Sequence, residues 1–207
     1  MNGVSNTITL GGIDHFSRWT AADSSWPLSM FSVGVPVAPG WNIISNPVET
    51  TEDSVSQLYP TAAFSYAFAF DPVTGYESRS RMVPGAGYWE KFSAGATQNL
   101  SGTRRTLDSI AVQGGWNMIG SISDAVDTSA VASVPPGLRV SEWFGYQSGY
   151  DPAVQLLPGR GYWVKTSGAG TFVLAGSGKA LKVHLADAEP VIDPQPGAGR
   201  SDSSHRP

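Results

Sequence analysis

Cysteine is absent from the 207-residue chain, and charged residues are scarce. The absence of cysteine excludes disulfides, thiol nucleophiles and cysteine-ligated metals. Charged residues make up 14% of the sequence, against about 25% in a typical domain. The formal net charge is -4 and no stretch is rich in lysine or arginine, so the basic surface of a nucleic-acid-binding protein is not expected.

Long apolar runs and clustered metal ligands are missing as well. The sequence has no run of about 18 apolar residues, so no membrane helix is predicted. Residues 1–10 lack the basic and apolar regions of a signal peptide. Neither a G-x-S-x-G nor an H-E-x-x-H motif occurs. We therefore predict no catalytic residues, no cofactor, no metal, no nucleic-acid partner and no membrane insertion. The three histidines lie far apart, which argues against a zinc site: His15, His184 and His205.

Glycine and proline, in contrast, are plentiful, with 24 and 15 residues. Together with many serines and threonines they favour short strands and turns over long helices. Hydrophobic residues make up 41% of the chain, which suffices for a packed core. The composition thus predicts a mainly β protein.

The sequence repeats itself at a fixed distance. "GWNIIS" at 40–45 returns 75 residues later as "GWNMIG", and "PGAGYWEKFS" at 84–93 returns 74 residues later as "PGRGYWVKTS". Ten of the 19 positions in 84–102 are identical to those in 158–176. Two copies of one structural unit explain this pattern.

Each copy predicts about five short strands and one short helix. The helices are expected within 50–60 and 124–136, where apolar residues lie three apart and a proline follows. Segment 104–114 joins the copies and is itself predicted to be a strand. A unit of about 75 residues without disulfides is small for independent stability. We therefore expect the two homologous units to pack together as a pseudo-symmetric sandwich or barrel.

Four segments follow from the repeat. Residues 1–37 are predicted to hold the end of a preceding β-domain and a connecting strand, because "HFSRWT" at 15–20 resembles the closing strand of β-domains in large exported bacterial proteins. Residues 38–112 are predicted to form the first repeat unit and residues 113–185 the second. Residues 186–207 are rich in proline and serine, which predicts a disordered tail.

The Gly-Trp-Asn opening and the later Pro-Gly-x-Gly-Tyr-Trp, both present twice within 38–176, resemble a known repeat. It occurs near the C-termini of secreted or cell-surface multidomain bacterial proteins that are exported by C-terminal sorting signals, as in type IX secretion. The resemblance implies a β-rich accessory module at an extracellular or cell-surface location. It brings no catalytic residues to this chain.

The repeated aromatic residues allow two interpretations. They could stack on sugar rings, or they could anchor the core of each unit. Since side chains alternate along a strand, the Tyr and Trp of each GYW motif should point to opposite faces. The repeat residues assigned a structural role are Trp41, Asn42, Tyr76, Tyr88, Trp89, Trp116, Asn117, Tyr150, Tyr162 and Trp163.

A second aromatic group is complete only in the later copy, so a ligand site confined to one copy would lie there. Its members are Trp143, Phe144, Tyr146 and Tyr150. The glycines of the two Pro-Gly-x-Gly segments precede a strand rather than a helix, so they are expected to shape a turn and not to bind phosphate.

The sequence favours a non-enzymatic structural or adhesive accessory module of an exported bacterial surface protein. A carbohydrate-binding module that uses exposed aromatic side chains is the alternative, and a fragment of a glycan-active enzyme is a weaker one. Polysaccharide or other cell-surface components are the expected partners.

Overall fold

The computed structural model describes residues 30–176, and this part of the chain is mainly β, as predicted. The earlier half contains one helix, α1 (Val55–Leu58). Its strands are β1 (Phe31–Val37), β2 (Gly40–Ser45), β3 (Val48–Glu49), β4 (Ala67–Asp71), β5 (Gly75–Arg79), β6 (Gly87–Phe92) and β7 (Ala96–Arg104). The predictions for residues 1–29 and for the tail 186–207 lie outside the described residues.

The later half contains one 3-10 turn, η1 (Thr128–Ala130). Its strands are β8 (Leu107–Val112), β9 (Gly115–Ile119), β10 (Val126–Asp127), β11 (Ala132–Val134), β12 (Phe144–Tyr146), β13 (Tyr150–Pro152), β14 (Gln155–Leu156), β15 (Tyr162–Thr166) and β16 (Gly170–Ala175). Strand β8 confirms the strand predicted within 104–114.

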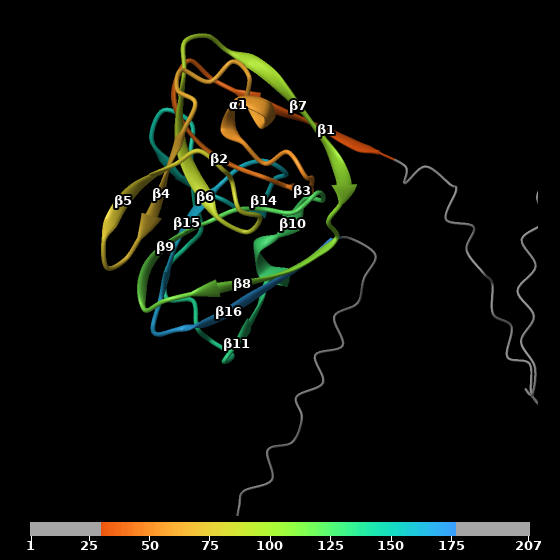
Figure 1. Ribbon diagram of the computed structural model, residues 1–207. Coiled ribbons are helices and arrows are strands. Elements are labelled where there is room, and N and C mark those ends of the chain that lie inside the picture. The colour runs from red at the N-terminus through yellow and green to blue at the C-terminus, as the bar shows by residue number, and fades with distance from the viewer. Residues whose placement is uncertain (1–29, 177–207) are drawn as a thin grey trace, which may run out of the picture.

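Within 30–176 the strands form five antiparallel sheets, none of which closes on itself. Two sheets have four strands, in the orders β2-β6-β4-β5 and β13-β12-β15-β9. The others are β1-β7-β3, β11-β16-β8 and the pair β10-β14. In the view of Figure 1, β1 and β7 lie at one end, β8, β16 and β11 lie at the other, and the two four-stranded sheets lie between them.

Corresponding strands of the two copies pair in the same way. Strand β2 pairs with β6 as β9 pairs with β15, and β1 pairs with β7 as β8 pairs with β16. These pairings group residues 31–37 with the first copy and residues 107–112 with the second. The strand pairing therefore begins each unit one strand earlier than the boundaries drawn from the sequence at 38 and 113.

The second predicted helix is largely replaced by other structure. Residues 128–130 form only the single turn η1, and residues 132–134 form β11 instead. Strand β11 pairs with the edge of β16, with Val134 opposite Thr171. The apolar spacing that suggested a helix covers too few residues to outweigh a sheet edge that offers backbone partners. The first predicted helix is present as α1 within 50–60.

Two residues of the repeat hold their units in the same way. The side-chain amide of Asn42 donates to the carbonyls of Ala38 and Gly40, and its oxygen accepts from the Ala38 N–H. Asn117 makes the same three bonds to Gln113 and Gly115. These bonds agree with the structural role expected of both residues, because each amide satisfies the backbone of the turn before its strand.

The tyrosine hydroxyl of each GYW motif is also bound. The Tyr88 hydroxyl accepts the Val83 N–H at 2.8 Å, and the Tyr162 hydroxyl accepts the Leu157 N–H at 2.7 Å. Both rings are buried in the core of their own unit, and burial raises the pKa of both hydroxyls. Each tyrosine thus fixes the turn that precedes its strand.

The two Pro-Gly-x-Gly turns each contact the other copy. The Gly120 N–H donates to the Gly85 carbonyl, and the Ser45 N–H donates to the Gly159 carbonyl, both at 2.8 Å. Gly85 and Gly159 have φ angles of 84° and 73°, a conformation that glycine adopts without strain. The repeated turn therefore joins the two units.

The second glycine of each turn is needed for a different reason. A Cβ at Gly87 would lie 2.7 Å from the Ile119 carbonyl oxygen. A Cβ at Gly161 would lie 2.5 Å from the Ile43 side chain and 3.0 Å from the Ile44 carbonyl oxygen. Only glycine lets the backbones of the two copies approach this closely.

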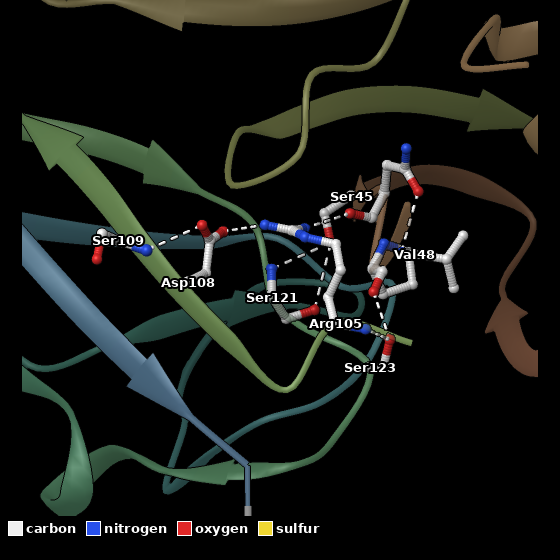
Figure 2. A network of polar contacts seen from close by, with 9 residues as sticks. Ser45, Val48, Arg105, Asp108, Ser109, Ser121 and Ser123 are labelled. Atoms are coloured by element: carbon white, nitrogen blue, oxygen red, sulfur yellow. Dashed lines mark hydrogen bonds and ion pairs between the residues drawn. The ribbon is translucent and has the colours of Figure 1, made fainter. Parts of the chain in front are cut away.

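A polar network also connects the copies (Figure 2). The Ser121 N–H donates to the Ser45 hydroxyl at 3.2 Å, and the Ser123 hydroxyl donates to the Pro47 carbonyl at 2.7 Å. Arg105 donates to the Asn46 carbonyl at 3.3 Å and forms an ion pair with Asp108. The contact region between the two copies will be called the joint. Because the serines are buried, these bonds satisfy polar groups that would otherwise destabilise the joint.

Candidate ligand-binding site

The strands of the two four-stranded sheets separate core residues from a second, aromatic face. Tyr88 belongs to the core of the first unit, whereas the adjacent Trp89 lies in a cluster between the units. Tyr162 and Trp163 divide in the same way. This confirms that each GYW motif points its two rings to opposite sides of the strand.

The cluster between the units is built from both copies. Ile43, Met118 and Trp163 are its buried residues. The two closest aromatic contacts across the joint are Phe70 with Trp163, whose centroids lie 4.8 Å apart, and Trp89 with Tyr146, whose centroids lie 4.7 Å apart. Both pairs meet edge to face, which is a favourable geometry for aromatic rings.

Two open grooves flank this cluster. The first, of about 480 Å³, will be called the Trp116 groove and is lined by Phe70, Trp116, Phe144, Tyr150 and Trp163. The second, of about 530 Å³, will be called the Trp41 groove and is lined by Trp41, Phe68, Tyr76, Trp89, Tyr146 and Tyr150. The ring of Tyr150 belongs to both, so the grooves adjoin one another.

Each groove has a partly exposed tryptophan set at right angles to a more buried one. The rings of Trp41 and Trp89 lie 6.4 Å apart at 89°, and those of Trp116 and Trp163 lie 6.3 Å apart at 88°. Trp41 and Trp116 are 42% and 41% exposed. Both rings therefore keep exposed surface that a ligand can contact, while the perpendicular partner packs against each ring.

Three of the four predicted ligand residues line the grooves. Phe144 lies in the Trp116 groove, Tyr146 in the Trp41 groove and Tyr150 in both. The prediction for Trp143 is corrected by the structure: its side chain is 1% exposed and packs against Phe172 in the second core. Alternation along the chain turns Trp143 inward, because the adjacent Phe144 faces the groove.

Other groove residues were not identified as ligand candidates from the sequence. Trp41 and Trp116 were expected to be structural anchors, yet they are the most exposed tryptophans in residues 30–176. Tyr76 was also expected to be an anchor, and it is 56% exposed. A usable signal did exist, since Trp41 and Trp116 alternate with the inward-facing Asn42 and Asn117 and so must face away from the core.

One acidic residue has an unusual environment. Glu90 lies on the core side of β6 and is fully buried. Its Oε1 accepts the Lys91 N–H at 2.9 Å, whereas its Oε2 has no partner among the described residues. Burial raises the pKa of Glu90 to about 7. Its opposite residue across the sheet is Asn42, so the pairing places no second carboxylate next to it.

Residues 30–176 contain no group of three or more His, Cys, Asp or Glu residues placed to hold a metal ion. The helices in this part of the chain include none that is long and apolar enough to cross a membrane.

In structural terms, the described region is a two-copy β protein whose joint bears paired aromatic grooves. No protein-family model, curated protein or solved structure matches the chain.

Proposed function

We propose that the protein is a non-enzymatic adhesive module of an exported bacterial surface protein, and that it binds polysaccharide through the Trp41 and Trp116 grooves. One observation carries this proposal: the same repeat position supplies a partly exposed tryptophan to each of two aromatic grooves. The extracellular or cell-surface location rests on the resemblance of the GWN and PGxGYW motifs to repeats of such proteins.

The chemistry of the grooves favours sugar rings. The lining residues named for both grooves are all aromatic, and pyranose rings present flat C–H faces that stack on indole and phenol rings. A site built from rigid aromatic side chains also loses little conformational entropy on binding. Two adjoining grooves suit an extended chain of sugars, because a second contact on the same ligand raises the affinity.

A purely structural role is the second candidate, and a different observation favours it. The Tyr88 and Tyr162 rings are buried, Trp163 is 7% exposed, and both Pro-Gly-x-Gly turns serve the joint between the copies. In this view the units form a pseudo-symmetric sandwich that acts as a rigid spacer, and the grooves hold no ligand. An enzymatic role has less support, since Glu90 points into the core and away from both grooves.

The test is binding of the full chain to a panel of immobilised polysaccharides, followed by calorimetry on the strongest binder. Trp41→Ala and Trp116→Ala should each weaken binding by about tenfold or more, because each removes the exposed stacking ring of one groove. Phe31→Ala, which removes a partly buried ring on β1 in another sheet, is the matched control and should bind normally. Unchanged binding in both tryptophan variants would show that the grooves do not hold the ligand, and no binding to any polysaccharide would leave only the structural role.

A further inference from the structure

The two copies carry a lysine at the same position of the repeat. Residues 30–176 contain two lysines, Lys91 and Lys165, and both follow the GYW motif at the same place in the repeat. Both side chains are exposed. Neither forms an ion pair within the part of the chain that the structure describes, whereas five of the six arginines there do.

The strand register places each lysine beside the exposed tryptophan of a groove. Trp41 lies directly opposite Lys91 in the β2–β6 pair, and Trp116 lies directly opposite Lys165 in the β9–β15 pair. Residues directly opposite one another in an antiparallel pair share a face, with Cβ atoms about 5 Å apart. Each lysine therefore shares a face with the tryptophan that lines a groove, and its long side chain can bring the ammonium group to the rim of that groove.

The other charged residues in these strands point to the opposite side. Side chains alternate between the two faces, so Glu90 next to Lys91 faces the core. Glu77 and Arg79 lie opposite Ala69 and Ala67, which face the first core. Asp71 and Asp151 lie opposite Gly75 and Gly145, at positions that alternate with the aromatic residues.

Among the strands described in the two four-stranded sheets, the aromatic face thus carries two charges, and both are positive. The nearby Glu142, just before β12, is paired with Arg139 at 3.8 Å. The chain as a whole has a net charge of -4. A pair of positive groups on the face that bears the two aromatic grooves is therefore a local feature of this site and does not reflect the overall composition.

We propose that the ligand of the two grooves is an acidic polysaccharide whose sugar rings carry carboxylates, with Trp41 and Trp116 stacking on the rings and Lys91 and Lys165 binding the carboxylates. This rests on the proposed function and adds the ligand class to it. A uronic acid unit presents a flat C–H face and a carboxylate on the same ring, which matches a tryptophan face with an ammonium group beside it. The repeat supplies this set twice, once for each groove.

The experiment compares polygalacturonate with its methyl ester, which keeps the rings and removes the charge. The full chain should bind polygalacturonate several-fold more tightly than the ester at low ionic strength, and added salt should reduce the difference. Lys91→Gln and Lys165→Gln should each weaken binding to polygalacturonate by about threefold, as expected for an exposed ion pair. The double variant should bind both polymers equally.

Two sets of control variants distinguish the loss of a positive charge from a loss of stability. Lys91→Arg and Lys165→Arg keep the positive charge and should retain most of the preference for polygalacturonate. Arg81→Gln removes an exposed cation that pairs with Asp53 outside the two sheets, and it should change nothing. The thermal melts of all variants should match that of the wild type.

The outcomes distinguish this inference from the proposed function. Equal binding of polygalacturonate and its ester, abolished by Trp41→Ala and Trp116→Ala, would overturn the role of the lysines and leave polysaccharide binding in place. Binding that survives both tryptophan variants would overturn the inference and the proposed grooves together. Equally tight binding of dextran sulfate would overturn the inference alone, because any polyanion would then suffice. Failure to bind any polysaccharide would overturn both.

Discussion

The two copies share their turns and their joint but differ in what fills their cores. The Asn42 and Asn117 amides make the same bonds, and so do the Tyr88 and Tyr162 hydroxyls. In the first copy the core rings include Tyr59 and Phe92, which lie 6.1 Å apart. In the second copy Trp143 and Phe172 fill the core with a centroid distance of 5.0 Å.

The sharpest difference is at one position of the GYW strand. The first copy buries Glu90 where the second buries Val164, although Lys91 and Lys165 follow both. Repetition has therefore preserved the groups that position the turns, together with the exposed tryptophan and the lysine beside each groove. The interior has accepted different residues, and the buried acid of the first copy has no counterpart in the second.

The largest expected effect breaks the similarity of the two GYW tryptophans. Trp163 is 7% exposed, whereas Trp89 is only partly buried. Trp163→Ala should lower the free energy of unfolding by about 3 to 5 kcal/mol, as removal of a buried ring does. Trp89→Ala should cost less, about 2 to 3 kcal/mol. Urea unfolding of both variants measures the difference. A variant whose free energy of unfolding equals that of the wild type would contradict the packing role of its ring.

A smaller effect exploits the difference between Glu90 and Val164. Because burial raises the Glu90 pKa from 4.5 to about 7, the folded protein holds a proton that the unfolded chain releases. The stability contributed by the protonated acid is fully present below about pH 4.5 and is lost as the pH rises through 7. The effect of Glu90→Gln on the free energy of unfolding should therefore depend on pH. It should be more favourable at pH 8 than at pH 4 by about 2 to 3 kcal/mol.

Unfolding of wild type and Glu90→Gln across this range of pH checks the prediction. Val164→Glu is the reciprocal change, and it should introduce a similar dependence on pH into the second copy. An identical pH profile for wild type and Glu90→Gln would mean that Glu90 ionises in the folded protein as it does in water.

The smallest of these effects tests the equivalence of the two turns. Gly87→Ala and Gly161→Ala each place a methyl group against the other copy, and each should destabilise the protein by about 1 to 3 kcal/mol. Gly149→Ala is the matched control, since no atom lies within 4 Å of its added Cβ. If the Gly87 and Gly161 variants were as stable as this control, the close approach of the copies would not be required for folding.

The strands and turns could be predicted largely because the information is local. The GWN and PGxGYW motifs mark where strands and turns lie, and alternation decides which residues share a face. The sequence did not predict β11, because residues 132–134 form a strand only where β16 offers an edge. That partner is nearly 40 residues away along the chain.

The grooves could be predicted only in part. Alternation shows that Trp41 and Trp116 face away from their cores, but it cannot show whether another element covers that face. Trp143 was misplaced for the related reason that it precedes β12, and the side on which a residue before a strand lies depends on how the loop enters the sheet. Exposure is decided by the packing of the two copies, and no single segment contains that information.

Each Pro-Gly-x-Gly turn packs against the other copy, and this limits the number of repeat copies that can pack together. In a solenoid each added repeat extends the stack, because every unit presents one face to the unit before it and another to the unit after it. Here each turn instead pairs with the end of the GWN strand, β2 or β9, of its counterpart. The pair is thereby self-limiting at two members, and a third copy inserted into the chain would have to displace an existing turn or fold apart from the others.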